Sequence, residues 1–331
     1  MPFSIAFFAL AALVVTILVA VGRPVLATRK LAAEAEKKCP PTGNFIDVDG
    51  NRIHYVETGE GRPIVFLHGL GAQLYHFAGP LFGSFGPGYR LIALDRPGSG
   101  YSRRAGGAGG GLSEQALAVR RFIAKMGLER PLVVGHSLGG AVALSLAVEH
   151  PEAISGIALL SPLTHMESAL RPEFKALYIP NRLVRWVVAN TIAVPRSFRF
   201  AQASLDFIFS PQKMPPDYLV EGGGWIGLRP SHFYASATDF TALPDDLPGI
   251  EARYGEIDMP VGLLFGTDDR VIDFAEHGAP MPGRIRNLDF EVIEGLGHMP
   301  HFVERQRTAD FIRRVAERAF EAECAAWEPG S

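Results

Sequence analysis

Apolar and polar residues recur with two different periods along residues 44–161. Phe45–Val56 forms two alternating runs on either side of Asp49-Gly50-Asn51, a pattern that predicts a β-hairpin. Helical periodicity extends from Ser113 to Met126, and Gly127 is placed to end that helix. Uninterrupted apolar runs at 64–67, 91–94 and 132–134 predict buried strands, and a further strand is expected at 154–160. Strands and helices in this order predict an α/β fold with a parallel, doubly wound sheet.

The alternation stops at residue 162 and resumes near residue 258. Between them lie aromatic and apolar helical pieces that proline interrupts repeatedly. Loops of this length without structure of their own are rare in compact domains, so we expect an inserted helical cap. Strand character returns at 261–265 and 288–293, and an amphipathic helix follows over 304–322. The cap is therefore expected to divide the core into two parts.

The N-terminal segment has the character of a membrane anchor. Ile5–Val21 is continuously apolar apart from Thr16, close to the roughly 20 residues that cross a bilayer core. No basic residue precedes it, and its only tolerable cleavage site lies beyond Arg23, which favours an uncleaved anchor over a signal peptide. Because the basic residues follow the span, the positive-inside rule predicts a single-pass protein whose main domain is cytoplasmic; the alternative is an exported, periplasmic domain.

Composition adds limits to this outline. The 331 residues are 47% hydrophobic and carry a formal net charge of −3. The sequence has no patch of basic and aromatic residues, so we expect no nucleic-acid partner. Cys39 and Cys324 form neither a metal-binding spacing nor a disulfide framework. We expect no metal or organic cofactor, and the oligomeric state stays open. The expected division is 1–22 anchor, 23–43 linker or juxtamembrane helix, 44–161 first core part, 162–258 cap and 259–331 second core part.

One motif carries the chemistry. Gly135-His136-Ser137-Leu138-Gly139 stands between a predicted strand and a helix of small residues that ends before Pro151. This is the strand–turn–helix setting of a G-x-S-x-G nucleophile elbow. The glycines are needed because the turn is tight and side chains there would strike neighbouring backbone. Ser137 is therefore the predicted nucleophile.

A serine hydroxyl needs a base to take its proton, and an acid to orient that base. Asp269 follows the predicted strand at 261–265, and His298 lies in a glycine-flanked loop after the next strand, so we expect them to be the acid and the base. Asp268 and His301 are the competing candidates, and we interpret Asp268 as a solvated turn residue. His136, inside the elbow, is expected to pack beside the site rather than to act as the base.

The tetrahedral oxyanion of an acyl transfer needs two donors. The residue after the nucleophile supplies the backbone N–H of Leu138. The second donor is expected to be Leu70 N–H, in the loop His68-Gly69-Leu70-Gly71 after the strand at 64–67. His68 is expected to brace this loop through hydrogen bonds. The glycine-rich run Asp95–Ser102 lacks the spacing of a phosphate-binding loop and is interpreted as a structural turn.

These motifs, in this order over residues 44 to 322, resemble those of the α/β-hydrolase fold family. The resemblance implies an eight-stranded, mostly parallel sheet flanked by helices, with a helical cap between strands six and seven. Ser137 disfavours the aspartate-nucleophile branches. Leu70-Gly71-Ala72 and Met299 differ from the richer glycine loop and the aromatic residue usual in meta-cleavage C–C hydrolases. The layout is similar to that of membrane-anchored monoacylglycerol lipases and related carboxylesterases.

The cap supplies the expectation about substrate. Its many apolar side chains indicate a pocket for an apolar acyl or alkyl group. The sequence therefore predicts a serine hydrolase that cleaves carboxylic esters of apolar substrates through an acyl-enzyme. The alternatives on the same triad are C–C bond hydrolysis, amide cleavage and perhydrolysis. The non-enzymatic alternative is a membrane-tethered ligand-binding protein that keeps the fold.

Overall fold

A computed structural model describes residues 7, 22–167 and 171–326. The predicted membrane anchor, residues 1–22, lies outside the described residues except at positions 7 and 22. Within the described part of the chain, no helix combines the length and the apolar character that a membrane crossing requires.

The core is one eight-stranded sheet of order β1-β2-β4-β3-β5-β6-β7-β8. Only the pairs β1–β2 and β2–β4 are antiparallel, which confirms the predicted eight-stranded, mostly parallel α/β-hydrolase sheet. The hairpin turn has positive φ at Asp49 and Gly50, as a tight two-residue connection requires. The strands are β1 Asn44–Val48, β2 Asn51–Thr58, β3 Gly61–Leu67, β4 Gly88–Leu94, β5 Leu132–His136, β6 Gly156–Leu160, β7 Val261–Gly266 and β8 Leu288–Ile293.

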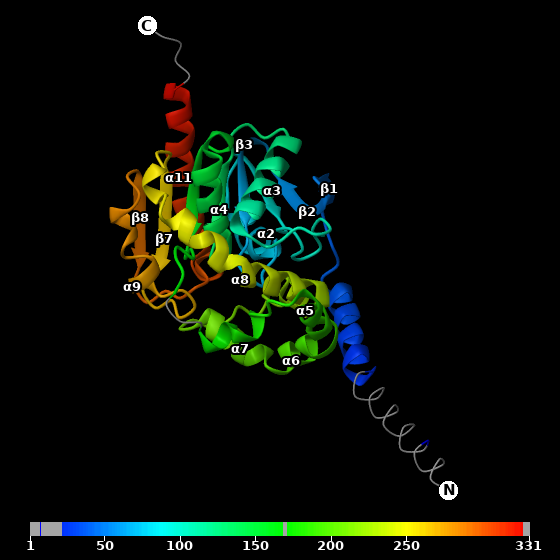
Figure 1. Ribbon diagram of the computed structural model, residues 1–331. Coiled ribbons are helices and arrows are strands. Elements are labelled where there is room, and N and C mark those ends of the chain that lie inside the picture. The colour runs from blue at the N-terminus through cyan, green and yellow to red at the C-terminus, as the bar shows by residue number, and fades with distance from the viewer. Residues whose placement is uncertain (1–6, 8–21, 168–170, 327–331) are drawn as a thin grey trace.

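Helices cover both faces of this sheet (Figure 1). Alternate residues of β3 face opposite layers: Val65 packs with the layer that includes α3 and α4, and Phe66 packs with the layer that includes α2 and α11. Because both faces are buried, the central strands are continuously apolar rather than alternating. The core helices are α2 Tyr75–Leu81, α3 Leu112–Lys125, α4 Leu138–Glu149, α9 Phe274–His277, α10 Pro300–Val303 and α11 Arg305–Ala326.

The insertion between β6 and β7 is helical. Figure 1 shows α5, α6 and α7 at one end of the molecule, with α8 between them and the core. Its helices are α5 Arg182–Val188, a π-helical turn Ala189–Ala193, α6 Val194–Arg199, α7 Ala201–Phe209 and α8 Pro230–Glu251. Short 3₁₀ turns of the chain are Phe82–Ser84, Pro151–Ala153, Pro172–Leu177, Gly224–Leu228, Tyr254–Glu256 and Met281–Gly283.

The segment 23–43 is helical through residue 38 and packs against the cap. Thr28 Oγ1 donates to Thr191 O at 2.7 Å, and Ala35 is buried against Val194 and Leu228. Arg229 adds an ion pair to Glu36 at 2.8 Å. The helix is thus fixed to the same end of the molecule as α5 and α6 (Figure 1).

Candidate active site

Ser137 occupies a strained turn between β5 and α4. Its φ of 53° and ψ of −119° are conformations that residues with a side chain rarely adopt. The neighbouring glycines permit this turn. A Cβ at Gly135 would overlap the backbone of Gly139, and a Cβ at Gly139 would overlap the carbonyl of Leu67. The serine side chain is thereby presented to the cavity at the end of the sheet.

His298 and Asp269 form a hydrogen-bonded pair beside this turn. Asp269, just after β7, accepts backbone N–H groups from Val271 and Ile272 at 2.8 and 2.9 Å through Oδ1. Its Oδ2 lies 2.7 Å from His298 Nδ1. A proton held at Nδ1 by this carboxylate leaves Nε2 with a free lone pair, the form a general base requires.

The serine and the histidine line the same cavity. Among the described residues, the His298–Asp269 pair is hydrogen-bonded, and no hydrogen bond joins His298 to Ser137 Oγ. Catalytic hydrogen bonds commonly tighten only when substrate is bound. Asp268 is exposed, and its carboxylate lies 2.9 Å from Thr267 Oγ1, so the structure places it in the turn and away from the histidine.

Leu70 and Leu138 are the two predicted oxyanion donors. Leu70 and Leu138 both line the cavity, and neither N–H donates in the hydrogen bonds of the described chain. Gly69 O accepts from Arg96 Nη2 at 3.1 Å. In a trans peptide the carbonyl and the following N–H point in opposite directions, so Leu70 N–H points away from Arg96. His68 braces this loop: its Nδ1 lies 2.8 Å from Gly69 O, and its Nε2 accepts Arg96 N–H at 3.0 Å.

Arg96 is a functional candidate that the sequence did not reveal. Its side chain is fully buried and donates to His68 O at 2.9 Å in addition to Gly69 O. Its charge is balanced by Asp239 of α8, whose Oδ2 lies 2.8 Å from Nη1, and Gln115 accepts from the same nitrogen. The loop His68–Gly71, which is predicted to hold an oxyanion donor, is therefore connected through one guanidinium to the cap.

A cluster of buried histidines lies behind His298. The His136 ring is 4.6 Å from that of His298 and 4.5 Å from that of His301, and His136 Nε2 donates to His298 O at 2.9 Å. Burial lowers the pKa of His136 and of His301 well below the usual range, and lowers that of His76 to about 3. These imidazoles are neutral near pH 7, and His136 supports the backbone of the predicted base.

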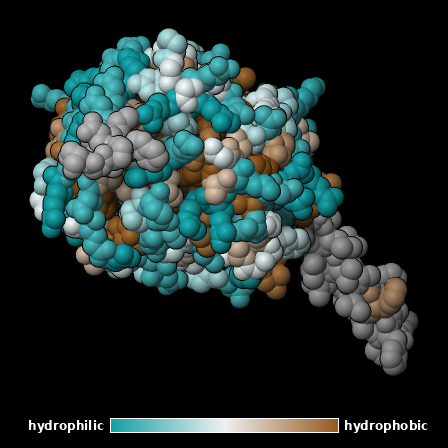
Figure 2. Space-filling model, turned by 90° about the horizontal axis from the view of Figure 1, so that it is seen from above, coloured by the Kyte–Doolittle hydropathy of each residue, from teal (hydrophilic) through white to brown (hydrophobic). Residues whose placement is uncertain are grey.

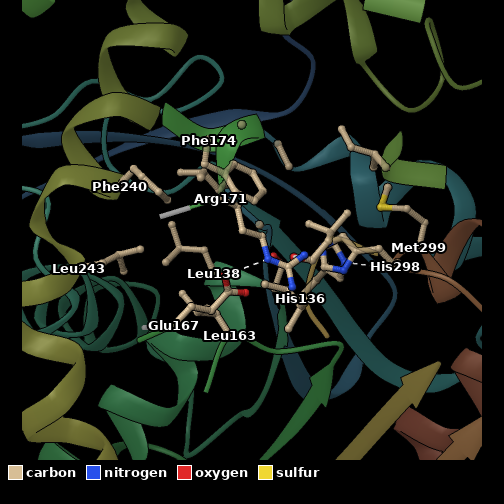
Figure 3. A pocket seen from close by; sticks show the side chains of 18 of the residues that line it. His136, Leu138, Leu163, Glu167, Arg171, Phe174, Phe240, Leu243, His298 and Met299 are labelled. Atoms are coloured by element: carbon tan, nitrogen blue, oxygen red, sulfur yellow. Dashed lines mark hydrogen bonds and ion pairs between the residues drawn. The ribbon is translucent and has the colours of Figure 1, made fainter. Parts of the chain in front are cut away.

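The cavity has a volume of about 380 Å³. Figure 3 shows His136 and His298 at one end, and Phe174, Phe240 and Leu243 at the other. Polar side chains on its wall include His76, His165 and Glu167, and Arg171 is the only arginine or lysine among the described lining residues. Its guanidinium is already bound by Glu167 at 2.9 Å and by Arg270 O at 2.8 Å. The far end is thus suited to an apolar group.

One group of side chains has the composition of a metal site. Ligand atoms of His165, Glu276 and His277 lie within 4.8 Å of one another. The two imidazole rings, however, stack at 4.1 Å with planes only 20° apart. Nearly parallel rings direct their nitrogen lone pairs side by side rather than toward one ion, so this arrangement does not fit a bound metal.

A mostly parallel sheet with a serine elbow after its fifth strand is the architecture of an α/β hydrolase. The chain belongs to the alpha/beta hydrolase fold family, whose model matches residues 62–305. The assignment covers the strands and loops that carry all of the predicted site residues.

The relatives differ in chemistry. One relative is the dihydrolipoyllysine-residue acetyltransferase component of an acetoin cleaving system from Cupriavidus necator. It is 41% identical over 122 residues, and this chain spans only 32% of its length. A 2-hydroxy-6-oxo-6-phenylhexa-2,4-dienoate hydrolase from Comamonas testosteroni is 27% identical over 82% of this chain and 91% of that protein. The crystal structure of a membrane phospholipase A, a bacterial virulence factor, has a TM-score of 0.68 at 24% identity, covering 97% of this chain and 99% of that one. Family membership therefore identifies the hydrolase scaffold, and the substrate must be inferred from the site.

Proposed function

We propose that this α/β hydrolase cleaves carboxylic esters with an apolar acyl or alkyl group, using Ser137 as nucleophile, His298 as base and Asp269 as orienting acid. The observation that carries the proposal is the arrangement around one cavity. A strained serine, a histidine already oriented by a buried carboxylate, and two unengaged amides all border the same space. Acyl transfer requires these three components together.

The proposed reaction has two halves. Ser137 Oγ attacks the ester carbonyl carbon while its proton passes to His298 Nε2, and the Leu70 and Leu138 amides hold the oxyanion. The tetrahedral intermediate collapses, the C–O bond to the alcohol breaks, and His298 returns the proton to the leaving alkoxide. Water then adds to the acyl-enzyme by the same relay, which releases the carboxylic acid and restores the serine.

The cavity wall supports an apolar substrate. Phe174, Phe240 and Leu243 lie opposite the histidines, at the end that a substrate chain would occupy (Figure 3). Burying such a chain is favourable by roughly 0.8 kcal/mol per CH₂ group. We also infer that residues 1–22 anchor the protein in a membrane, with the hydrolase domain on the cytoplasmic side, because the basic residues follow the apolar segment. Such an anchor would hold the site near lipid-soluble esters.

C–C bond hydrolysis is the second candidate, because the Comamonas testosteroni relative is named as a hydrolase of 2-hydroxy-6-oxo-6-phenylhexa-2,4-dienoate. Its dienoate substrate carries a carboxylate, which a cation in the cavity would be expected to bind. Arg171 is the one such group in the described lining, and it is already engaged by Glu167 and backbone carbonyls. This occupancy favours an uncharged ester.

Covalent labelling and substrate comparison test the proposal on the full chain in detergent. A fluorophosphonate should label the native protein and leave Ser137→Ala unlabelled. Among p-nitrophenyl esters, kcat/KM should rise from acetyl to medium-length acyl groups, and exceed that for 2-hydroxy-6-oxo-6-phenylhexa-2,4-dienoate. Equal labelling of both proteins, or faster cleavage of the dienoate, would contradict it.

A further inference from the structure

The outer surface of the cap is unusually apolar for a surface in water. Seven large apolar side chains are exposed along α5, the π-helical turn and α6, among them Leu183 at 70% and Trp186 at 58%. We call this surface the outer cap face; its members are Leu183, Val184, Trp186, Val187, Ile192, Phe198 and Phe200. By contrast, the opposite end of the molecule is mostly hydrophilic (Figure 2). Large apolar side chains exposed along consecutive helices, as they are here, are typical of a binding surface.

The charge of the outer cap face has one sign. Between residues 182 and 205 the chain contains four arginines and no aspartate or glutamate. Arg182, Arg196 and Arg199 are exposed. The guanidinium carbons of Arg196 and Arg199 lie 5.3 and 5.7 Å from the centre of the Phe200 ring. Helices with aromatic and aliphatic side chains on one surface and arginines beside them bind the interface of anionic bilayers.

The N-terminal helix brings this face close to the predicted anchor. The apolar segment ends at Val21, and Thr28 contacts Thr191, next to Ile192, at 2.7 Å. Seven residues of α-helix span about 10 Å along the helix axis, and less along the membrane normal when the helix is tilted; the headgroup layer on one side of a bilayer is about 5–8 Å thick. A segment that leaves the hydrocarbon at Val21 would therefore hold the outer cap face at headgroup depth.

We propose that the outer cap face is a membrane-binding surface that lies in the headgroup region of an anionic bilayer. This proposal rests on the anchoring given under the proposed function and adds the orientation of the domain. Tyr178, four residues before α5, is 46% exposed and lines the cavity. The docked cap thus places the rim of the cavity beside the bilayer, so that the substrate class is an ester dissolved in the membrane.

Tryptophan quenching tests the contact directly. The full chain is reconstituted in vesicles of phosphatidylcholine and phosphatidylglycerol that contain brominated lipids. If Trp186 lies in the bilayer interface, the native protein should lose a fraction of its fluorescence that Trp186→Phe does not lose. Equal quenching of the two proteins would overturn the proposal. This readout does not depend on enzymatic activity, so it remains decisive if the ester-hydrolase proposal fails.

A triple variant tests the consequence for substrate uptake. Leu183→Ser/Ile192→Ser/Phe198→Ser should lower hydrolysis of a vesicle-embedded lipid ester by about tenfold or more, because interfacial binding scales with buried apolar area. Hydrolysis of a water-soluble p-nitrophenyl ester should be unchanged. The control, Leu117→Ser/Val292→Ser, removes apolar side chains that are 39% and 38% exposed elsewhere on the molecule, and it should leave both rates unchanged. The proposal would be overturned if the triple variant and the control hydrolysed the vesicle-embedded ester at equal rates. It would also be overturned if the outer cap face proved to be a dimer interface in detergent without lipid.

Discussion

Replacement of Arg96 by methionine should uncouple the oxyanion loop from its support. Methionine fills much of the space of the arginine but makes none of its four side-chain hydrogen bonds. Two of these hold the carbonyls of His68 and Gly69, and therefore the direction of the Leu70 N–H. The other two neutralise Asp239 and engage Gln115. The substitution is expected to affect both stability and catalysis, for different reasons.

The cost in stability comes from the carboxylate that remains. Removing one partner of a buried ion pair typically costs about 3–5 kcal/mol, because a charge stays buried without compensation. Asp239 is fully buried but keeps a second contact to Arg104, so we expect the lower end, about 3 kcal/mol. Urea unfolding of native and variant protein measures this difference.

The cost in catalysis comes from the loop. Deleting an oxyanion donor lowers kcat by about 10²–10³, and here the Leu70 amide is loosened rather than removed, so we expect a loss of about 10–100-fold. The loss should appear in kcat with little change in KM, since the oxyanion exists only in the transition state. Rates for p-nitrophenyl esters are normalised to active sites counted by fluorophosphonate labelling.

Asp239 allows the two effects to be separated. Asp239→Asn leaves Arg96 in contact with both loop carbonyls, so it should lose stability while kcat falls by less than about threefold. In Arg96→Met/Asp239→Asn no carboxylate is left unpaired, and stability should recover relative to Arg96→Met. The kcat of the double variant should stay low. A double variant that regains activity together with stability would refute the positioning role of Arg96.

Two further predictions concern the predicted acid and the buried histidines. Asp269→Asn should lower kcat by about 10³–10⁴ by favouring the wrong imidazole tautomer, whereas Asp268→Asn should leave ester hydrolysis within about twofold of native. His76 has a folded pKa of about 3, and burial also lowers the pKa of His136 and His301, so the unfolded chain takes up more protons below pH 6.5. The free energy of unfolding should therefore fall as the pH drops from 6.5 toward 3. Urea titrations at pH 7.5 and pH 5 measure the decrease in the free energy of unfolding between these two pH values. His301→Leu should make that decrease smaller by about 2 kcal/mol, and an unchanged decrease would argue against a neutral buried histidine at position 301.

The strands of the core were predictable because their environment is uniform. Residues 64–67 and 132–134 are buried on both faces, so each position must be apolar and the run is visible without knowledge of its neighbours. The cap was not predictable in detail, because its helices are set by contacts rather than by local pattern. α8 runs for 22 residues through Pro244 and Pro248, which local rules read as helix breaks.

The candidate site divides in the same way. Ser137, Asp269 and His298 each follow a predicted strand and stand among glycines or in a tight turn, so local sequence marks them. Their expected roles remain predictions that the experiments above address. Arg96 and Asp239 are 143 residues apart, and neither stands in a motif that predicts the other. A pairing of this kind exists only after folding.

That pairing changes how the cap should be understood. The sequence predicts a core that performs the chemistry and a cap that lines an apolar substrate pocket. Asp239, however, belongs to α8 of the cap, and it is the buried anion that balances the charge of Arg96 beneath the loop His68–Gly71. A displacement of α8 would therefore leave the buried guanidinium of Arg96 without its carboxylate partner, even if no core residue moved. If the outer cap face binds a bilayer, then one insertion carries both the membrane-binding surface and Asp239, the carboxylate that pairs with Arg96 beneath the predicted oxyanion donor.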